Sequence, residues 1–553
     1  MTSLKTSYWP ADKSHTLLET TLGDLLRRVA DEVPERVALV EGVADSGRRR
    51  RWTYAQLLDE AERVACALLE RFHPGERVVV YAANSPEWMI LQHAMSIAGI
   101  VLVPVNPAYT TRELDYVARN CNAAGIFYDD SYRERDLRTI VDELRGALPG
   151  MREYISFTDF SAFAATGNPA AVFPHISPEQ TLQFQYTSGT TGAPKGALLH
   201  HRGVINTARN IALRMQFPDG GIHINAMPMF HIAGAAVAEM GVIARRGTFV
   251  LMPHFDAALM LELFESERGN ATLIVPTMIL ALLDHPDRAI RDVSSMQTIL
   301  TGAANVPAAL VRRTQHELHC KICIIFGQTE SNGPITLSAP DDSIEDQTDT
   351  VGKPLPHVDV KIVDSNSERT VPLRTVGEIW VKGYQTMSGY HDLPEASMAT
   401  VRADGWLRTG DLGTMDSRGY VRITGRLKEM IIRGGMHLYP KEMEDVLFDH
   451  PGVAQVSVLG VPDEKWGEVV AAVILAADLE HPPSVANLAE FCRSRLASQK
   501  IPELWCFVSE YPLTPSGKIQ KPVLQDWIAE GRLTPTILKV RAGNIEITRE
   551  SRN

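Results

Sequence analysis

The chain has 553 residues, of which 44% are hydrophobic and 22% are charged. This is the composition of a folded protein with more than one domain, and it excludes a disordered chain. The formal net charge is 55 − 67 = −12, which argues against a general nucleic-acid-binding or membrane-surface protein. Local basic residues must therefore hold any anionic ligand.

The six cysteines are too few for a disulfide framework in a chain of this length, and a reducing cytoplasm is the location we expect. His316, His319, Cys320 and Cys323 have the residue types of a zinc site. We favour a simpler interpretation, in which a helix ends before a buried strand over residues 322–326 and Cys323 is a small core residue.

Neither the N-terminus nor the most apolar stretch predicts a membrane segment. Residues 1–6 have no apolar signal core. Residues 89–105 are interrupted by polar residues, glycine and proline, so we expect no integral membrane helix.

Hydrophobic periodicity predicts a largely parallel α/β architecture after an irregular arm over residues 1–20. The expected helices are residues 57–72, 86–98, 112–121, 257–267 and 306–319. The expected strands are residues 77–81, 100–104, 125–128, 182–186, 222–227, 248–252, 272–275, 297–300 and 322–326.

From about residue 341 the pattern changes to short alternating strands, at residues 358–363, 378–382 and 420–424, as in a small antiparallel barrel. The last 125 residues or so contain their own strands (456–459, 469–474, 506–508) and helices (441–448, 485–496), enough for a small α+β domain. The predicted domains are 1–425 and 431–553, joined by a hinge at 426–430.

The stretch Tyr186-Thr187-Ser188-Gly189-Thr190-Thr191-Gly192-Ala193-Pro194-Lys195-Gly196 follows a predicted strand. Glycines let a ligand approach the backbone, and hydroxyls, N–H groups and a lysine suit phosphate oxygens. The spacing differs from a Walker A loop, and the alternative is an ordinary flexible turn. The stretch closely resembles the phosphate loop of the adenylate-forming superfamily, which comprises acyl-CoA synthetases, luciferases and peptide-synthetase adenylation domains.

The resemblance covers about residues 20–521 and implies a fold. That fold has a large N-terminal region of two α/β subdomains and a small β-barrel, followed by a small mobile α+β lid. In the phosphate loop, it implies that Thr187, Ser188, Gly189, Thr190, Thr191 and Lys195 bind ATP or AMP.

Phe326-Gly327-Gln328-Thr329-Glu330 stands where a buried strand ends, the usual place for a ligand in an open α/β sheet. The resemblance implies that Phe326 lies beside adenine and that Thr329 lies beside the α-phosphate. It also implies that Glu330 and Thr187 bind Mg²⁺. Phe326 stands where the family usually has a tyrosine. This replacement keeps a ring that can stack on adenine, but it removes the hydroxyl. A similar small turn, Gly302-Ala303-Ala304, is expected against adenine. Without the resemblance, Glu330 could lie at a solvated loop end, and Gly302-Ala303-Ala304 could be a plain strand-to-helix turn.

Trp406-Leu407-Arg408-Thr409-Gly410-Asp411 is similar to the family's ribose motif, in which Asp411 accepts hydrogen bonds from the ribose hydroxyls. Arg426 is expected to face the nucleotide. The alternative for Asp411 is a turn aspartate beside glycine.

Met227-Pro228-Met229-Phe230-His231-Ile232-Ala233-Gly234 is similar to the motif that shapes the acyl pocket, where His231 borders the carboxylate. Alone, His231 would be read as a core histidine. Peptide-synthetase domains place an aspartate in this motif, so Phe230-His231 argues against an α-amino acid. The expected pocket residues are Met227, Phe230, His231, Gly234, Met278, Asn305 and Asn332, and they favour a fatty, aromatic or alicyclic acid.

The remaining motifs belong to the lid. Lys428 matches the family's hinge residue, with an exposed interdomain lysine as the alternative. Arg433, Gly434 and Gly435 resemble the loop beside the coenzyme A tunnel. Pro512-Leu513-Thr514-Pro515-Ser516-Gly517-Lys518-Ile519 matches the catalytic-lysine loop, and Lys518 suits stabilisation of charge on the α-phosphate.

The resemblance predicts an ATP-dependent acid:CoA ligase that forms an acyl adenylate and then a thioester. Its catalytic residues would be Lys518, Thr329, Glu330 and His231, and its substrates and cofactors would be a small carboxylic acid, ATP, Mg²⁺ and coenzyme A. An enzyme that loads a carrier protein, a luciferase-like oxidase and a catalytically dead nucleotide-binding protein are the alternatives. The sequence leaves open which acid is used and whether the protein is a monomer or a homodimer.

Overall fold

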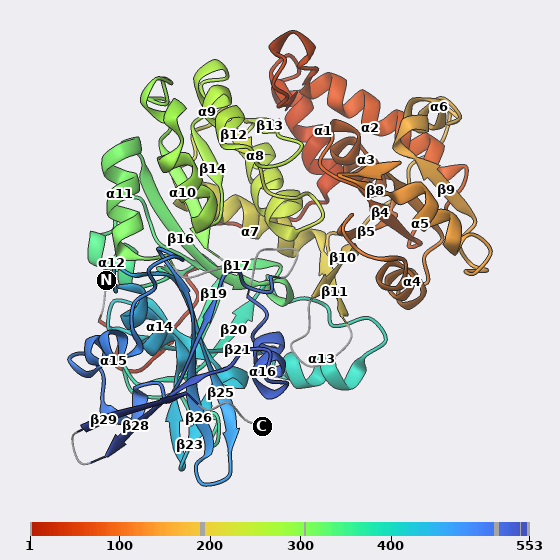
Figure 1. Cartoon of the computed structure of the whole chain (residues 1–553). Helices are drawn as coiled ribbons and strands as arrows, with labels where there is room; N and C mark the ends of the chain where they lie inside the picture. Colours follow the sequence, from red (N-terminus) through yellow and green to blue (C-terminus); the bar gives the residue numbers. More distant parts are fainter. Residues whose placement is uncertain (1–2, 188–193, 303–305, 514–518, 542–543, 550–553) are drawn as a thin grey trace. The chain divides into compact units, whose positions relative to one another are not determined.

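The computed structural model describes residues 3–187, 194–302, 306–513, 519–541 and 544–549 (Figure 1). The chain divides into two compact units, and each is described by itself. The first comprises residues 1–361, 380–409 and 416–421, and the second comprises residues 362–379, 410–415 and 422–553. These divisions fall within or beside strands β19 (Val358–Val363), β20 (Gly377–Gly383), β21 (Leu407–Met415) and β22 (Val421–Arg426). The domain borders around a hinge at 426–430 stay a prediction.

A six-stranded sheet opens the first unit, with the order β11-β10-β5-β4-β6-β9. Its strands are β4 (Arg77–Tyr81), β5 (Val101–Val105), β6 (Gly125–Tyr128), β9 (Glu153–Ser156), β10 (Thr181–Thr187) and β11 (Lys195–His200). Strands β4, β5, β6 and β9 pair in parallel, as alternation with helices predicts, whereas β10 and β11 form an antiparallel hairpin at one edge. Helices α4 (Thr111–Asn120) and α5 (Leu137–Leu144) bury Leu114, Val117 and Val141 in the core on one side of this sheet.

Helix α3 (Pro86–Ala98) begins and ends at the residues that the sequence predicts. The Ser85 side chain accepts a hydrogen bond from Trp88 N, Pro86 occupies the first turn, and Gly99 ends the helix with φ +71°. A hydroxyl N-cap, an early proline and a left-handed glycine are strong local signals, which explains the agreement.

A nine-stranded sheet forms the rest of the first unit's framework, with the order β18-β17-β16-β15-β14-β12-β13-β2-β3. Its strands are β2 (Val37–Glu41), β3 (Arg51–Thr53), β12 (Ile222–Asn225), β13 (Thr248–Leu251), β14 (Ala271–Leu273), β15 (Thr298–Gly302), β16 (Lys321–Gln328), β17 (Gly333–Leu337) and β18 (Lys353–Pro354). Helices α9 (Ala257–Ser266), α10 (Pro276–Asp284) and α11 (Ala308–Leu318) lie beside it (Figure 1) and share one hydrophobic core with its strands.

The other elements of the first unit complete its layers. They are the helices α1 (Leu22–Glu32), α2 (Tyr54–Leu69), α6 (Phe160–Ala164), α7 (His201–Arg214), α8 (Glu239–Ala244), α12 (Ile344–Asp349) and α13 (Pro394–Thr400), the short strands β7 (Ser131–Tyr132) and β8 (Arg135–Asp136), and the helical turns η1 (Ser46–Arg48), η2 (Phe157–Asp159), η3 (Ala233–Ala238), η4 (Pro286–Ala289) and η5 (Thr329–Ser331). Helices and longer strands thus begin at α1 and β2, before the first helix that the sequence predicts.

The predicted barrel strands lie in a five-stranded sheet with the order β1-β19-β20-β21-β22. Its first strand, β1 (Tyr8–Trp9), corrects the expectation that residues 1–20 are irregular throughout. Tyr8 and Trp9 pair with Lys361 and Val360, and a side chain at Gly419 would collide with the Trp9 ring, its Cβ standing 2.1 Å from Trp9 Cε3. Partners some 350 residues away create this strand, so no local pattern could predict it.

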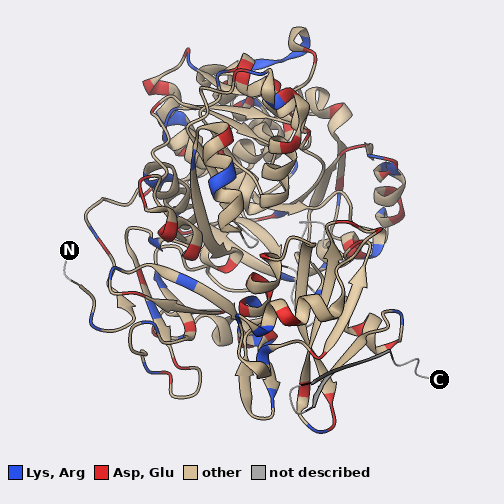
Figure 2. Ribbon diagram, turned by 60° about the vertical axis from the view of Figure 1, so that its left-hand side comes forward, with Lys and Arg blue, Asp and Glu red and all other residues tan. Residues whose placement is uncertain are grey.

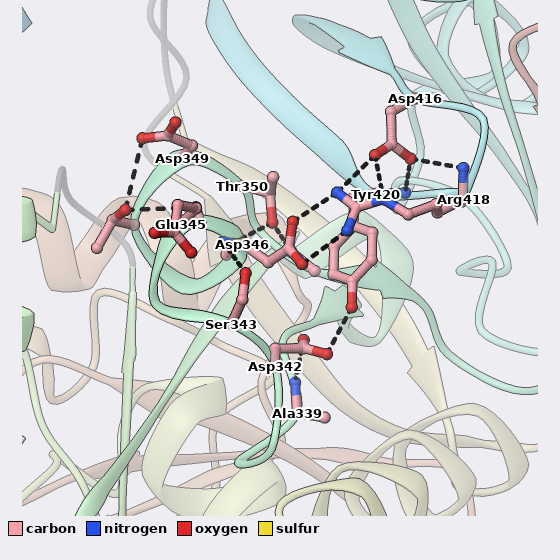
Figure 3. A network of polar contacts seen from close by, with 12 residues as sticks. Ala339, Asp342, Ser343, Glu345, Asp346, Asp349, Thr350, Asp416, Arg418 and Tyr420 are labelled. Atoms are coloured by element: carbon pink, nitrogen blue, oxygen red, sulfur yellow. Dashed lines mark hydrogen bonds and ion pairs between the residues drawn. The ribbon is translucent and has the colours of Figure 1, made fainter.

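A polar network ties α12 to the turn before β22 (Figure 3). The Arg418 guanidinium donates two hydrogen bonds to Asp346, at 2.9 and 2.6 Å, and one to Asp416. The Tyr420 hydroxyl donates to Asp342 at 2.5 Å. Bidentate guanidinium–carboxylate pairs have a fixed geometry, so this network orients the start of β22.

The second unit contains a seven-stranded sheet whose main path is β24-β23-β26-β27-β28-β29, with β25 pairing β26. Its strands are β23 (Ile431–Arg433), β24 (Met436–Leu438), β25 (Val453–Asp463), β26 (Gly467–Ala476), β27 (Leu504–Val508), β28 (Thr536–Arg541) and β29 (Asn544–Arg549). Helices α14 (Pro440–Phe448) and α15 (Val485–Arg493) share one core with the sheet, and α16 (Lys521–Ala529) contributes Leu524 to another. The turns η6 (Leu427–Glu429) and η7 (Ser498–Lys500) complete the described part.

Cys323 is a buried core residue, as the sequence predicts. Acidic and basic positions are interspersed along the ribbon (Figure 2). All six cysteines are free and buried, Cys323 among them. Within the described ranges, no three His, Cys, Asp or Glu side chains are grouped to hold a metal ion, and no helix is long and apolar enough to cross a membrane.

Candidate active site

The first part of the candidate site is the hairpin of β10 and β11, which places Thr187 and Lys195 directly opposite each other. The Thr187 hydroxyl lies 3.4 Å from the Lys195 carbonyl oxygen, to which it donates. The Tyr116 hydroxyl donates to the Pro194 carbonyl at 2.8 Å. Ser188, Gly189, Thr190 and Thr191 lie outside the described residues, so their role in phosphate binding stays a prediction.

The second part stands at the adjacent carboxyl ends of the parallel strands β15 and β16, where Gly302 pairs with Ile325. Two glycines are required there because a Cβ at Gly302 would lie 2.5 Å from the Ile325 carbonyl oxygen, and one at Gly327 would lie 2.4 Å from Pro334 Cα. Phe326, Gln328 and Thr329 follow in this stretch and are half-buried. Ala303, Ala304 and Asn305 lie outside the described residues.

Tyr390 brings these two parts together, and the sequence analysis missed it. Its hydroxyl donates to Glu330 Oε1 at 2.6 Å, while Lys195 Nζ lies 5.1 Å from the centre of its ring. Met387 N also donates to the Glu330 carbonyl at 2.9 Å. The sequence itself offered only the pair Gly389-Tyr390 as a signal. The structure adds that Gly389 has φ +137° and that Tyr390 forms a β-bridge with Ala197 of β11.

The electrostatics of this cluster suit an anionic ligand with a bound cation. Burial, then the charge of Glu330 and its hydrogen bond, raise the pKa of Tyr390, so the hydroxyl stays a donor. The residues that the resemblance gives to Mg²⁺ are Glu330, which supplies a carboxylate, and Thr187, which supplies a hydroxyl. Mg²⁺ commonly takes only one or two protein carboxylates and completes its shell with phosphate oxygens and water, so these residues fit it when a nucleotide is bound.

The third part is the stretch Met227–Gly234. Its backbone and that of Ala235 are held by four buried side-chain amides that the sequence analysis also missed. Asn84 and Asn225 donate to the Met227 carbonyl at 3.1 and 2.9 Å, and Asn84 Oδ1 accepts from Met229 N at 2.7 Å. Gln185 donates to the Phe230 carbonyl at 2.9 Å, and Gln92 donates to the Ala235 carbonyl at 3.0 Å. No local pattern links these four amides, because each comes from a different element.

This stretch runs into η3, a π-helical turn, and two contacts fix the junction. A Cβ at Gly234 would lie 2.4 Å from the Pro228 carbonyl oxygen, so only glycine fits. His231 Nδ1 accepts a hydrogen bond from Ala233 N at 3.2 Å, which orients the half-buried ring. π-helical turns are common at functional sites, and this one contains Gly234 and begins two residues after His231, both of which are expected to border the acid.

Met278 and Asn332 are less directly connected to the site. Met278 packs against the core of the nine-stranded sheet. Asn332 is fully buried with φ +50°, and its amide donates to the Gln385 carbonyl at 3.0 Å. Their contribution to an acyl pocket stays a prediction, as do the roles of Met227 and Phe230, both half-buried.

In the second unit, the structure brings together the two residues expected to bind the nucleoside. Arg426 Nε lies 3.2 Å from Asp411 Oδ1, and the Arg426 side chain is 47% exposed whereas that of Asp411 is 11% exposed. Gly410, with φ +72°, donates its N–H to Glu378 at 3.1 Å and turns the strand beside Asp411. A ribose would compete with Arg426 for the same carboxylate.

The turn η6 carries the predicted hinge residue. Lys428 is exposed, and its side chain makes no hydrogen bond or ion pair with the described residues. Its neighbour Glu429 pairs with Lys521 at 2.9 Å, and Lys521 also pairs with Glu444 at 2.8 Å. Burial opposes the charged lysine, but the two carboxylates outweigh it and raise the pKa of Lys521.

The predicted coenzyme A residues form the tight turn between β23 and β24. Gly434 and Gly435 have φ +56° and +80°, and Gly434 N donates to the Trp466 carbonyl at 2.7 Å. The Arg433 guanidinium pairs with Glu503 and lies 5.1 Å from the centre of the Trp466 ring. Lys518 lies outside the described residues, so its catalytic role stays a prediction.

Comparisons with known proteins identify the family of this chain. Residues 26–391 match the model of the AMP-binding enzyme family, and residues 442–518 match that of the AMP-binding enzyme C-terminal domain. A putative acyl-CoA synthetase, YngI, of Bacillus subtilis is 35% identical over 92% of this chain and 97% of its own length. A medium-chain acyl-CoA ligase, mitochondrial ACSF2 of Macaca fascicularis, is 33% identical over 92% of this chain and 87% of its own.

Two further comparisons bear on substrates. A Rhodococcus jostii CoA ligase for a methyl-dioxo-octahydro-indenyl propanoate is 35% identical over 92% of this chain and 98% of its own. The crystal structure of ATP-bound MatB from Rhodopseudomonas palustris superposes with a TM-score of 0.83 at 29% identity, covering 92% of this chain and 99% of that one.

Proposed function

The chain belongs to the AMP-binding enzyme family as an AMP-forming acid:CoA ligase, and we propose that it activates a fatty, aromatic or alicyclic acid. The observation that carries the choice of acid is the character of the described acyl stretch. Met227, Phe230 and Gly234 are apolar, and neutral amides hold their backbone. The names of the medium-chain and indenyl-propanoate relatives support the same class.

In the first half-reaction, the acid's carboxylate oxygen attacks the α-phosphorus of ATP, an acyl–phosphate bond forms, and pyrophosphate leaves. Lys195 and Thr187 bind the phosphates, Thr329 and Lys518 stabilise charge that develops at the α-phosphate, and His231 borders the carboxylate. Glu330 and Thr187 would hold Mg²⁺, which when bound would neutralise negative charge on the phosphates.

In the second half-reaction, the coenzyme A thiolate attacks the acyl carbonyl, the thioester bond forms, and AMP leaves with the electron pair of the acyl–oxygen bond. We propose that Lys428 absorbs the backbone rotation between the half-reactions and that Arg433, Gly434 and Gly435 border coenzyme A. Neither step needs an enzyme nucleophile. Burial raises the pKa of Cys121 and Cys320 to about 12, so these thiols stay protonated.

We also propose a reducing compartment such as the cytoplasm, because all six cysteines are free and buried.

The test is AMP release with ATP and Mg²⁺ over a panel of acids, each with and without coenzyme A. The panel runs from acetate through medium- and long-chain fatty acids to benzoates, cinnamates and bulky cyclic acids, with malonate and an α-amino acid as charged controls. Acid-dependent AMP release that rises strongly with coenzyme A, and only for apolar acids, is the expected result.

Other outcomes separate the alternatives. Turnover of malonate or of the amino acid would contradict the proposed acid class. Acid-dependent adenylate that stays bound regardless of coenzyme A would instead indicate a carrier-protein loader or an oxidase.

A further inference from the structure

A recess of about 280 Å³ in the first unit is lined by residues of α1, α7 and the end of α8. Arginine dominates its lining: Arg28 comes from α1, Arg209 from α7, and Arg245 and Arg246 follow α8. Glu32 is its one acidic lining residue. In a chain with a net charge of −12, this is a local concentration of the opposite sign.

Most of this positive charge has no carboxylate partner. Arg246 pairs with Glu32 at 3.0 Å and also with Asp219. Arg28, Arg209 and Arg245 form no ion pair with any residue in the described part of the chain. Burial, then the charges of Arg28 and Arg245, lower the pKa of Arg209, as expected where like charges converge without compensation.

The recess is held in shape by contacts that leave guanidinium groups available. Arg209 donates one hydrogen bond to the Thr16 carbonyl, at 3.0 Å, and Arg245 donates one to the Phe217 carbonyl, at 3.2 Å. Leu18, which also lines the recess, is fixed by two hydrogen bonds with the Asn206 side chain, at 2.8 and 2.9 Å. A guanidinium has five N–H donors, so each arginine retains donors for a ligand.

Helix-end chemistry accounts for only part of this arrangement. Arg245 is the C-cap residue of α8, where a positive charge complements the helix dipole. That explanation does not extend to Arg209, which lies within α7, or to the exposed Arg28 on α1. Three elements bring these arginines to one recess, and none of them belongs to the candidate active site.

We propose that this recess is a second anion site, which binds the phosphate groups of a ligand carrying at least two negative charges. Guanidinium groups match phosphate oxygens in geometry and charge. Three arginines without a carboxylate partner can balance about three negative charges on the ligand. The site is separate from the nucleotide site, yet α8 continues directly from η3, the turn at the acyl stretch. Occupancy would therefore stabilise the helices beside that stretch by mass action.

The test measures binding of inorganic tripolyphosphate to the full-length protein by calorimetry. We expect two sites in the wild type, because the catalytic site also binds phosphates. Arg28→Glu, a change at an exposed side chain, should weaken one site at least tenfold, and Arg209→Gln should do the same. Arg268→Ala is the matched control, since it removes an arginine charge whose partner is the surface residue Asp292. Acid-dependent AMP release should be retained by all three variants.

A second arm identifies the source of the phosphate. Vesicles containing phosphatidic acid, whose phosphomonoester headgroup carries up to two negative charges, and vesicles of phosphatidylcholine alone are compared in sedimentation with the wild type and Arg28→Glu. Arg28-dependent binding to the anionic vesicles alone assigns the recess to a lipid headgroup, and tripolyphosphate binding assigns it to a free phosphate compound. Isotherms and sedimentation that are the same in the wild type and Arg28→Glu would overturn the proposal.

Discussion

At the scale of single residues, Tyr390 shows how one side chain organises chemistry from distant parts of the chain. Lys195 begins β11, Glu330 follows β16, and Tyr390 contacts both at once. A tyrosine can do this because its ring faces a cation while its hydroxyl donates to a carboxylate. Glu330 is thereby held with one oxygen engaged, which limits its rotamers before any ligand arrives.

Tyr390→Phe should weaken the use of Mg²⁺ while leaving the fold intact. The variant keeps the ring over Lys195 and loses only the hydrogen bond to Glu330. A hydrogen bond to a charged group contributes about 1.5–3 kcal/mol, so the Mg²⁺ concentration for half-maximal adenylation should rise about tenfold. Tyr420→Phe is the matched control, because its hydroxyl donates to Asp342 in the network of Figure 3. An unchanged Mg²⁺ midpoint in Tyr390→Phe would contradict a positioning role.

Lys518→Ala should separate the two half-reactions. A lysine that stabilises charge on the α-phosphate is needed to form the adenylate and not to transfer its acyl group. Pyrophosphate release should fall at least a thousandfold, while thioester formation from a supplied acyl adenylate changes less than about threefold. Lys500→Ala, which breaks an exposed pair with Glu442, is the control. Equal loss of both half-reactions in Lys518→Ala would refute the assignment.

At the scale of elements, the stretch from Met227 to η3 is shaped by packing rather than by its own propensity. Buried amides satisfy its carbonyls, as buried backbone requires. Behind η3, the fully buried Glu239 accepts from Gln92 at 2.9 Å and contacts His93 Nε2 at 2.7 Å. These contacts come from β10, β12, α3 and the residues after β4, so four elements must assemble before the turn takes its form.

Gly234→Ala should impair use of the acid more than use of ATP. The added Cβ would meet the Pro228 carbonyl oxygen at 2.4 Å, and relief requires the stretch to shift, at about 1–3 kcal/mol. The KM for the acid should rise about tenfold or more, and the KM for ATP should change less than about twofold. Gly150→Ala, whose Cβ would meet nothing within 4 Å, is the control. Equal changes in the two KM values would show that Gly234 acts on the fold as a whole.

At the scale of the whole molecule, the first unit buries several groups that respond to pH. His223 is fully buried in β12, with its ring stacked 5.9 Å from that of Phe249. Burial lowers the pKa of His223 to about 3, and burial lowers that of His201 to about 3. Between about pH 3 and pH 6.5 the unfolded chain therefore binds protons that the folded chain does not, so stability falls as the pH falls through this window.

His223→Phe should make the protein less sensitive to acid. Each such histidine contributes up to about 1.4 kcal/mol per pH unit to the slope of stability between pH 6 and pH 4, and phenylalanine removes one of these contributions while preserving the stacked volume. The midpoint of urea unfolding, followed in the full-length protein at several pH values, should fall less steeply in the variant. His481→Phe, at an exposed position, is the control. A slope equal to that of the wild type would show that His223 does not titrate on unfolding.

The sequence by itself determined the features that depend on short spans of chain. The hydroxyl cap, proline and glycine around α3 set its ends, alternation of helices and strands set the parallel pairing of β4, β5 and β6, and the order of motifs identified the family. These signals are local because caps, turns and periodicity act within a few residues.

Only the tertiary structure decided which side chains meet across long separations. It paired Tyr8 and Trp9 with β19, placed Tyr390 between Lys195 and Glu330, set four amides around Met227–Gly234, and gathered unpaired arginines from α1, α7 and α8. The physical reason is that such contacts form between faces whose juxtaposition depends on sheet order and helix packing. A short segment of sequence contains information on neither sheet order nor helix packing.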